Sequence, residues 1–244
     1  MALYAIADLH LSTLETTNKS MEVFGRRWSG YTEKLKSNWQ RLITDDDTVV
    51  IPGDVSWALT LEEAESDLRF LDSLPGKKIL GKGNHDFWWS TMKKHETFLA
   101  KCDITSISFL YNNAHEVGEF ILAGTRGWFY DEDIRTIPKN SDFEKIAARE
   151  ALRLEMSLNE AEKLKEKSPE KEIIVFTHFP LKYEDEVCEN LIPTLKNHGI
   201  KRLYYGHIHG NYTLPERFVY EGIEMNIISA DYLSFIPKHI PNLP

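Results

Sequence analysis

The sequence predicts a single α/β domain. Short apolar or β-branched runs alternate with segments of helical periodicity along the whole chain, which is the pattern of parallel strands joined by helices. The chain has 244 residues, of which 42% are hydrophobic, so it is long enough to bury a large core. No repeat, low-complexity linker or change in composition divides it, and we therefore expect one domain over residues 1–244.

The first half of the chain alternates regularly between the two kinds of segment. Apolar and β-branched runs predict strands at residues 3–7, 48–51, 77–80, 106–111 and 120–124. Helical spacing predicts helices at residues 31–43, 61–73 and 91–101. In the second of these helices, Ala64, Leu68 and Leu71 share one face, as in an amphipathic helix.

The second half continues the pattern with one longer helix. Ser141 and Glu144 have the spacing of a capping box and predict a charged helix that runs to about residue 167. Further strands are expected at residues 173–177, 202–205 and 225–229, and a further helix at 187–198. The region 128–170 allows a lid or an insert, and the proline-rich end, 237–244, is expected to lie extended over the surface.

The charge balance narrows the classes of partner. The formal net charge is −9, so a basic surface for nucleic acid or for an anionic membrane is not expected, and acidic residues at 131–133 disfavour long nucleic acids further. No run approaches the ~20 apolar residues of a membrane helix. Cys102 and Cys188 are far apart and fit a reducing compartment, so we expect a cytoplasmic protein without a disulfide scaffold. The sequence leaves the oligomeric state open.

Five short polar strings follow the apolar runs and offer ligands for metal ions. They are Asp8-Leu9-His10, Gly53-Asp54, Gly83-Asn84-His85-Asp86, Thr177-His178-Phe179-Pro180 and Gly206-His207-Ile208-His209. In parallel sheets, groups beyond the carboxyl ends of the strands gather at one edge. The carboxylates, imidazoles and amide oxygen are enough for two metal ions that share one carboxylate. Each string alone has a plainer explanation, such as a turn or a surface histidine, and their order and common position favour the metal site.

The ordered strings resemble the pattern of the calcineurin-like metallophosphoesterase superfamily, which is D-x-H, G-D, G-N-H-D/E, a lone histidine and G-H-x-H. The match runs from residue 8 to residue 209, and residues 8–39 are also similar to an uncharacterised bacterial branch of predicted phosphohydrolases. The resemblance implies a four-layer αββα sandwich of two mixed β-sheets flanked by helices, with the site at one edge.

The resemblance also implies a role for each site residue. Two metal ions would each have three ligands of their own, namely Asp8, His10 and His209 for one ion, and Asn84, His178 and His207 for the other. Asp54 would bridge both ions and so share in catalysis. His85 would not bind metal but would face the scissile group as the general acid.

The chemistry suits this set of residues. Mixed nitrogen and oxygen ligands favour Mn, Fe, Zn or Ni over Ca or Mg. Two carboxylates and a bridging hydroxide, the expected nucleophile, leave a charge of about +1 on two divalent ions, which attracts a phosphate anion. Relatives with an extended G-D-x-x-D string carry a carboxylate that orients the acid, but this chain has Trp57 at that position. Asp86 is the candidate to take over this role.

Residues outside the strings are weaker candidates. Arg126 follows a strand and lies next to a glycine, and it is expected to bind the substrate phosphate together with His85, although a surface ion pair is the plainer alternative. Lys82 and Arg26 are further candidates for a phosphate contact. Five tryptophans either wall a cleft for a planar leaving group or fill the core: Trp28, Trp57, Trp88, Trp89 and Trp128. Four other histidines are expected at the surface: His95, His115, His198 and His239.

Together these features predict a phosphohydrolase with two transition-metal ions, whose substrate is a phosphodiester or a small phosphorylated metabolite. A phosphomonoesterase of the same fold is one alternative, and a metal-bound protein-interaction scaffold without turnover is another. A barrel-type amide hydrolase is disfavoured, because such enzymes carry H-x-H at the first strand and this chain carries it last.

Overall fold

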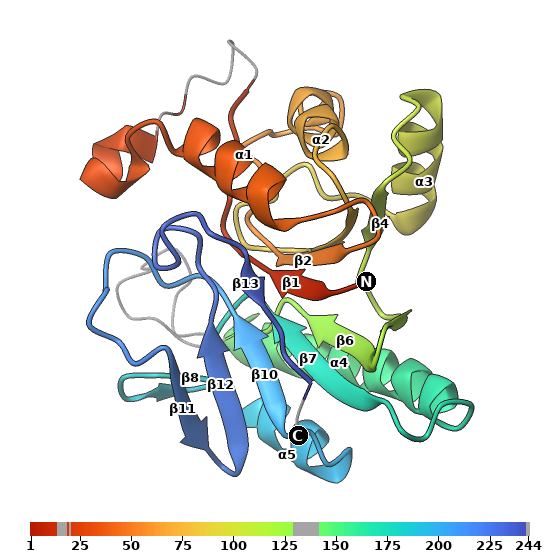
Figure 1. Ribbon diagram of the computed structural model, residues 1–244. Coiled ribbons are helices and arrows are strands. Elements are labelled where there is room, and N and C mark those ends of the chain that lie inside the picture. Colours follow the sequence, from red (N-terminus) through yellow and green to blue (C-terminus); the bar gives the residue numbers. More distant parts are fainter. Residues whose placement is uncertain (14–18, 20, 129–141, 243–244) are drawn as a thin grey trace.

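Two β-sheets lie face to face and carry helices on their outer sides (Figure 1). The computed structural model describes residues 1–13, 19, 21–128 and 142–242. Within them, one sheet has five strands in the order β13-β1-β2-β3-β4, and the other has six in the order β11-β12-β10-β7-β6-β5. Both sheets combine parallel and antiparallel pairs. The predicted four-layer αββα sandwich of two mixed sheets is confirmed.

The first sheet is built from the N-terminal half of the chain and its C-terminal end. Its strands are β1 (Leu3–Ala5), β2 (Thr48–Pro52), β3 (Lys77–Gly81), β4 (Ile107–Phe109) and β13 (Lys238–His239). Its outer face is covered by α1 (Tyr31–Leu42), α2 (Glu65–Asp72) and α3 (Met92–Lys101), with the 3₁₀ turns η1 (Met21–Phe24) and η2 (Arg26–Trp28) before α1. Strands β1 to β4 pair in parallel, as expected for strands joined by helices.

The second sheet is built from the rest of the chain. Its strands are β5 (His115–Val117), β6 (Phe120–Thr125), β7 (Glu172–Thr177), β10 (Arg202–Tyr205), β11 (Arg217–Tyr220) and β12 (Ile223–Ile227). The helices on its outer side are α4 (Asp142–Lys165) and α5 (Ile192–Asn197), with the 3₁₀ turn η3 (Glu189–Leu191) before α5. A small hairpin of β8 (Lys182–Tyr183) and β9 (Glu186–Val187) stands apart from both sheets.

Alternate residues of the strands divide the core into layers. In β2, Val50 faces the space between the sheets, whereas Val49 and Ile51 pack on the helix side. In β7, Ile174 faces the other sheet and Val175 packs under α4 and α5. This alternation explains why the strands read as continuous apolar runs, because both faces of each sheet are buried.

The two sheets are joined where the candidate site lies. Ala7, just after β1, forms a parallel bridge to Ser229, just after β12. The main-chain N–H of Ala7 donates to the oxygen of Ile228 at 2.7 Å. The carboxyl ends of strands from both sheets therefore meet at one edge, and the loops that follow them converge there.

The C-terminal segment differs from its prediction. Residues 238–239 form β13, which pairs antiparallel with β1 and closes the edge of the first sheet. Ile240 is 1% exposed and its main-chain N–H donates to Leu3 at 2.8 Å. The proline-rich composition suggested a surface tail, but the apolar side chain of Ile240 finds a place between the sheets. Segment 187–198 also differs, since its helix begins only at Ile192, after β9 and η3.

Part of the expected lid belongs to the sandwich itself. Residues 142–165 form α4, whose Leu154, Leu158 and Ala161 are fully buried against the second sheet. Residues 129–141, including the acidic residues 131–133 and Ser141 of the expected capping box, lie outside the described residues. Both cysteines are buried and form no disulfide. None of the described helices has the length and apolar character that crossing a bilayer requires.

Candidate metal centre

Strained loops deliver the predicted ligands to the shared edge of the sheets. Four site residues have a left-handed backbone, with φ values of 61° for Asp8, 45° for His10, 50° for Asp54 and 69° for His207. Such conformations cost of order 1–3 kcal/mol each for non-glycine residues and cluster at functional sites. They are held in place by main-chain hydrogen bonds, since the N–H of Asp8 donates to Gly53 at 3.1 Å and that of His10 donates to Asp54 at 2.9 Å.

Glycine allows two of these loops to approach closely. A Cβ on Gly53, after β2, would lie 2.6 Å from the Cα of Gly83, after β3. Only glycine therefore fits at Gly53. This approach brings Asp54 next to the string that contains Asn84 and His85.

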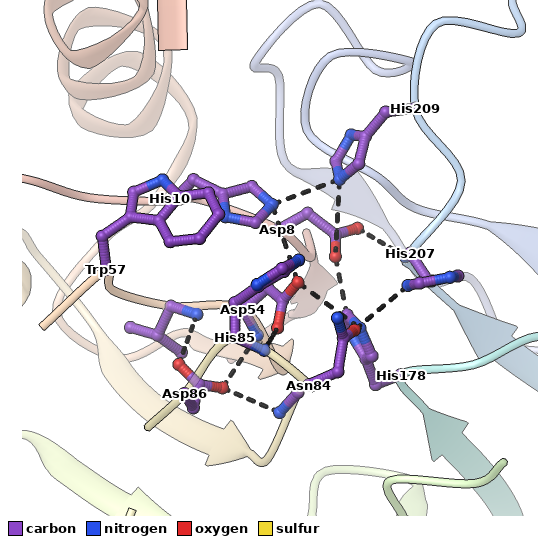
Figure 2. Close-up of polar contacts among 12 residues, drawn as sticks. Asp8, His10, Asp54, Trp57, Asn84, His85, Asp86, His178, His207 and His209 are labelled. Atoms are coloured by element: carbon purple, nitrogen blue, oxygen red, sulfur yellow. Dashed lines mark hydrogen bonds and ion pairs between the residues drawn. The ribbon is translucent and has the colours of Figure 1, made fainter. Parts of the chain in front are cut away.

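The first group of ligand atoms comes from Asp8, His10 and His209, and its atoms lie within 4.8 Å of one another (Figure 2). The Nε2 atoms of His10 and His209 are 3.2 Å apart, and His209 Nε2 is 4.0 Å from Asp8 Oδ1. Two imidazoles and a carboxylate from two distant strings thus point at one position, as predicted for the first metal ion.

The second group comes from Asp8, Asp54 and His178, also within 4.8 Å. His178 Nε2 is 3.5 Å from Asp54 Oδ2 and 2.6 Å from Asn84 Oδ1, and Asn84 Oδ1 is 3.2 Å from His207 Nδ1. The residues predicted for the second ion therefore come together. One detail was not predicted, since Asp8 belongs to both groups, with its Oδ1 3.4 Å from His178 Nδ1.

Burial controls the protonation of these groups. It raises the pKa of Asp8 to about 6 and that of Asp54 well above its usual range, with the nearby carboxylate of Asp86 raising the latter further. It also lowers the pKa of His178 well below its usual value and that of His207 to about 3, helped by neighbouring imidazoles. The imidazoles of His178 and His207 are thus neutral at pH 7 and free to offer a lone pair, whereas the carboxylates lack compensating positive charge.

The donor set fits divalent metal ions. In the described part of the chain, Asp8 Oδ1 and His178 Nδ1 are buried without a hydrogen-bond partner. Buried polar atoms without a partner are costly, and bound cations would satisfy them and offset the buried carboxylates. Carboxylate and amide oxygens together with imidazole nitrogens are the ligands that Mn, Fe, Zn and Ni share.

Asp231 is a site residue that the sequence reasoning missed. It is fully buried, and its Oδ1 accepts a hydrogen bond from Nδ1 of His209 at 2.8 Å, which leaves Nε2 to face the ligand group. Burial alone would lower the pKa of His209, but this hydrogen bond and the charge of Asp8 outweigh it and raise the pKa. Asp231 lies shortly after β12, and its place beyond a strand end, like that of the five strings, was the available signal.

His85 lies beside the ligand groups. Its main-chain N–H donates to Asp54 Oδ1 at 2.8 Å, and its ring lies 4.5 Å from Trp57 and 5.7 Å from His10 between centroids (Figure 2). Burial, followed by the charges of His209 and Lys19, lowers the pKa of His85 to about 4. It takes part in neither ligand group found among the described residues.

Asp86 holds the loop rather than the His85 ring. Its Oδ2 accepts from the N–H groups of Asp54 at 2.8 Å and Gly83 at 2.7 Å. Its Oδ1 accepts from the N–H of Val55 at 2.9 Å and from the Trp88 indole at 3.0 Å. Both oxygens are thus used on the loops after β2 and β3, so the suggestion that Asp86 orients the imidazole of His85 is wrong.

The tryptophans serve mainly as core. Trp88 and Trp28 are 2% and 1% exposed, and Trp128 packs edge-on against Phe179 at 5.1 Å. Trp57 is the one in contact with both His10 and His85, and Trp89 packs against His95 and Phe109.

One of the histidines expected at the surface is not there. His95 is fully buried against Trp89 and Phe109, and its Nε2 accepts from the N–H of Ser90 at 2.9 Å. The prediction was wrong because the sequence neighbours of His95 are polar, whereas His95 itself lies on the buried face of α3. His115 and His198 are half-buried, and His239 is exposed.

Arg126 lies next to a predicted ligand. Its main-chain oxygen accepts from the N–H of His178 at 3.0 Å. Its side chain forms an ion pair with Glu150 of α4, with Nη2 to Oε1 3.4 Å, and lies 4.8 Å from the ring centroid of Trp128. The ion pair is thus present but partly buried, and the role of Arg126 in substrate binding stays a prediction. Arg26 is exposed in η2.

Comparisons with known proteins agree with this geometry. The family model described as calcineurin-like phosphoesterase matches residues 1–211, which include all the predicted ligands. No curated protein matches the chain.

Solved structures with a similar fold include the phosphopantetheinyl hydrolase of Mycobacterium tuberculosis, with 16% identity, coverage of 100% of this chain and 96% of that chain, and a TM-score of 0.53. A protein from Thermus thermophilus has 10% identity, coverage of 94% and 89%, and a TM-score of 0.55. A protein of unknown function from Aquifex aeolicus has 17% identity, coverage of 98% and 95%, and a TM-score of 0.43.

Proposed function

The chain belongs to the calcineurin-like phosphoesterase family, and from this premise we propose that it is a dinuclear-metal-dependent phosphohydrolase that cleaves a phosphodiester or a small phosphorylated metabolite. One observation carries the proposal. Asp54 belongs to the second group of ligand atoms, and its Oδ2 lies 3.5 Å from His178 Nε2 of that group and 3.6 Å from His10 Nε2 of the first. A carboxylate oxygen in that place is what two neighbouring cations need to offset their mutual repulsion.

The proposed division of the ligands between the two ions follows the resemblance. Asp8, His10 and His209 would hold one ion, and Asn84, His178 and His207 the other, with Asp54 shared. The donor types favour Mn, Fe, Zn or Ni. The fixed tautomer of His209, set by Asp231, supports its role as an Nε2 ligand.

When bound, such ions would activate a water molecule for attack on phosphorus and neutralise the charge of the phosphoryl oxygens. Residues of the chain would supply proton transfer and substrate binding. His85, held through its N–H by Asp54 and packed on Trp57, would donate a proton to the leaving oxygen or a hydrogen bond to a phosphoryl oxygen. A phosphate anion beside the ring would raise the pKa of His85 from its low value in the free protein. Arg126 would contribute to substrate binding.

The charge of the chain supports a small substrate. The formal net charge of −9 repels long polyanions, whereas metal ions in the buried centre attract a single phosphoryl group locally. A phosphodiester benefits most from a general acid, because its alkoxide leaving group is poor.

A substrate panel tests the proposal. Phosphomonoesters and phosphodiesters, including a phosphopantetheinyl diester suggested by the hydrolase of similar fold, would be assayed after loading with Mn, Fe, Zn or Ni. We expect metal-dependent release of alcohol or phosphate from at least one class, abolished by chelation and restored by metal. Full metal occupancy without turnover of any ester would contradict the proposal and favour a binding scaffold.

A further inference from the structure

A cluster of three positively charged residues lies beside the metal centre. Lys82 follows β3 and precedes the predicted ligand Asn84 by two residues, Arg126 follows β6, and Arg153 belongs to α4. Because the main-chain oxygen of Arg126 accepts from the N–H of His178, these cations and the metal centre border the same loops.

The carboxylate of Glu150 is buried between the two arginines. Glu150 is 5% exposed, and its Oε1 is 3.4 Å from Arg126 Nη2 and 3.6 Å from Arg153 Nε. Its Oε2 accepts from the hydroxyl of Thr125 at 2.6 Å. One carboxylate shared in this way cannot neutralise two guanidinium groups, and Lys82 adds a third positive charge.

Lys82 has no carboxylate of its own. In the described part of the chain it forms no hydrogen bond or ion pair. Lys82 is half-buried, and the charges that act on its ammonium group are those of Arg126, Asp86, Glu150 and Arg153. Lys82 thus lies close to two other cations.

Two buried donors at the same place lack an acceptor. Arg126 Nε and Trp89 Nε1 are both buried without a hydrogen-bond partner among the described residues. The Trp89 ring lies 5.7 Å from that of Tyr111, which in turn lies 4.6 Å from the guanidinium of Arg153 and accepts a hydrogen bond from it. Unpaired donors next to uncompensated positive charge are satisfied by an anion with several acceptor oxygens.

We propose that Lys82, Arg126 and Arg153 form a second anion site beside the metal centre, which binds a second phosphoryl group carried by the substrate. The inference rests on the proposed function, because the first phosphoryl group is the one that reacts at the metal ions. It narrows the substrate class to small molecules with two phosphoryl groups, joined by a spacer that reaches from the loops after β1 and β10 to the end of β6.

Binding of phosphonates, which cannot be hydrolysed, tests the site without any turnover. The manganese-loaded protein would be titrated by calorimetry with alkylphosphonates that carry one phosphonate, and with α,ω-alkylbisphosphonates of increasing spacer length. We expect at least one bisphosphonate to bind about tenfold or more tightly than the monophosphonate of the same length, because charge-assisted hydrogen bonds to a second anion are added.

Two variants test which residues cause the preference for bisphosphonates. Lys82→Gln removes a cation without a partner in the described part of the chain, and Arg153→Gln leaves Glu150 paired with Arg126. Both should bring the ratio of the two dissociation constants close to one. Arg69→Gln is the matched control, because Arg69 also pairs with a glutamate of its own helix, Glu65, but on the solvent-exposed side of α2. It should keep the preference of the wild type.

The outcomes separate this site from the proposed function. Equal affinity of the wild type for mono- and bisphosphonates at every spacer length, or a preference that survives both Lys82→Gln and Arg153→Gln, would overturn the second anion site, whatever esters the enzyme hydrolyses. Failure to hydrolyse any ester would overturn the proposed function, and a bisphosphonate preference lost in the two variants would still support the anion site.

Discussion

The indole of Trp57 lies against the imidazole of His85, with ring centroids 4.5 Å apart (Figure 2). The same indole stacks on the ring of His10 at 4.9 Å, with planes 25° apart. The family pattern with the extended string has a carboxylate at the position of Trp57. This chain has an aromatic ring there instead, which packs against His85.

Replacement of Trp57 should separate positioning from chemistry. We expect Trp57→Ala to lower kcat by about 10- to 100-fold, because His85 loses the surface that fixes its ring. Trp57→Phe should recover most of this loss, since a smaller aromatic ring still packs there. The readouts are kcat and KM on the best ester of the panel, with metal content measured in each variant. Wild-type kcat in the alanine variant at full metal occupancy would show that Trp57 does not position His85.

Replacement of His85 itself should spare the metals. His85 belongs to neither ligand group among the described residues, so His85→Asn should keep the metal content of the wild type. It should lower kcat by ~10²–10⁴ if the imidazole acts as an acid. The loss should be smallest for esters with good leaving groups, such as aryl esters, which need little protonation. Equal loss for alkyl and aryl esters would assign His85 to charge stabilisation instead.

Asp54 and Asp231 should affect the two metal ions differently. Asp54→Asn removes the carboxylate between the two groups, so we expect weaker binding of both ions, measured by elemental analysis after dialysis against defined free metal. Normal stoichiometry in this variant would contradict the bridging role.

Asp231→Asn should affect only one of the two proposed metal positions, because Asp231 contacts the ligand His209. Loss of a carboxylate partner of a ligating histidine typically costs 10–100-fold in metal affinity, and we expect about that effect on the ion that Asp8, His10 and His209 are proposed to hold. The other ion should bind as in the wild type. Equal weakening of both ions would show that Asp231 acts on the whole site rather than on His209.

The sequence predicts that the candidate ligands gather at one edge, because they lie at strand ends. A strand that is buried on both faces reads as an apolar run, and the first polar residue after it, such as Asp8 or Asp54, must lie at the carboxyl edge of the sheet. The membership of Asp8 in both ligand groups depends on how the two sheets dock, and the contact of Asp231 with His209 depends on the loops after β12 and β10. Neither follows from spacing in the sequence.

Local composition misled the prediction where tertiary packing decides. His95 has polar neighbours in sequence, yet it faces Trp89 and Phe109 across the helix–sheet interface. Ile240 lies in a proline-rich end, yet the edge of β1 was open for an antiparallel partner. In both cases the deciding contact comes from a segment more than ten residues away or on another element, which no local pattern contains.

Lys78 gives a prediction about stability that is independent of the site. Its side chain is fully buried in β3, where its Nζ donates to Leu74 and to the hydroxyl of Ser106, and burial lowers the pKa of Lys78 to about 8. Between pH 8 and the ordinary lysine value near 10.4, the unfolded chain binds a proton that the folded chain does not, so stability rises with pH there. Below pH 8 both states are protonated and the full cost of the buried charge is present.

Lys78→Met removes this titration. The difference in free energy of unfolding, wild type minus variant, should therefore increase by roughly 2–3 kcal/mol from pH 7.5 to pH 10.5 in urea titrations. Other groups that titrate in this range cancel in the difference, and a difference that does not change with pH would mean that Lys78 stays protonated in the folded protein.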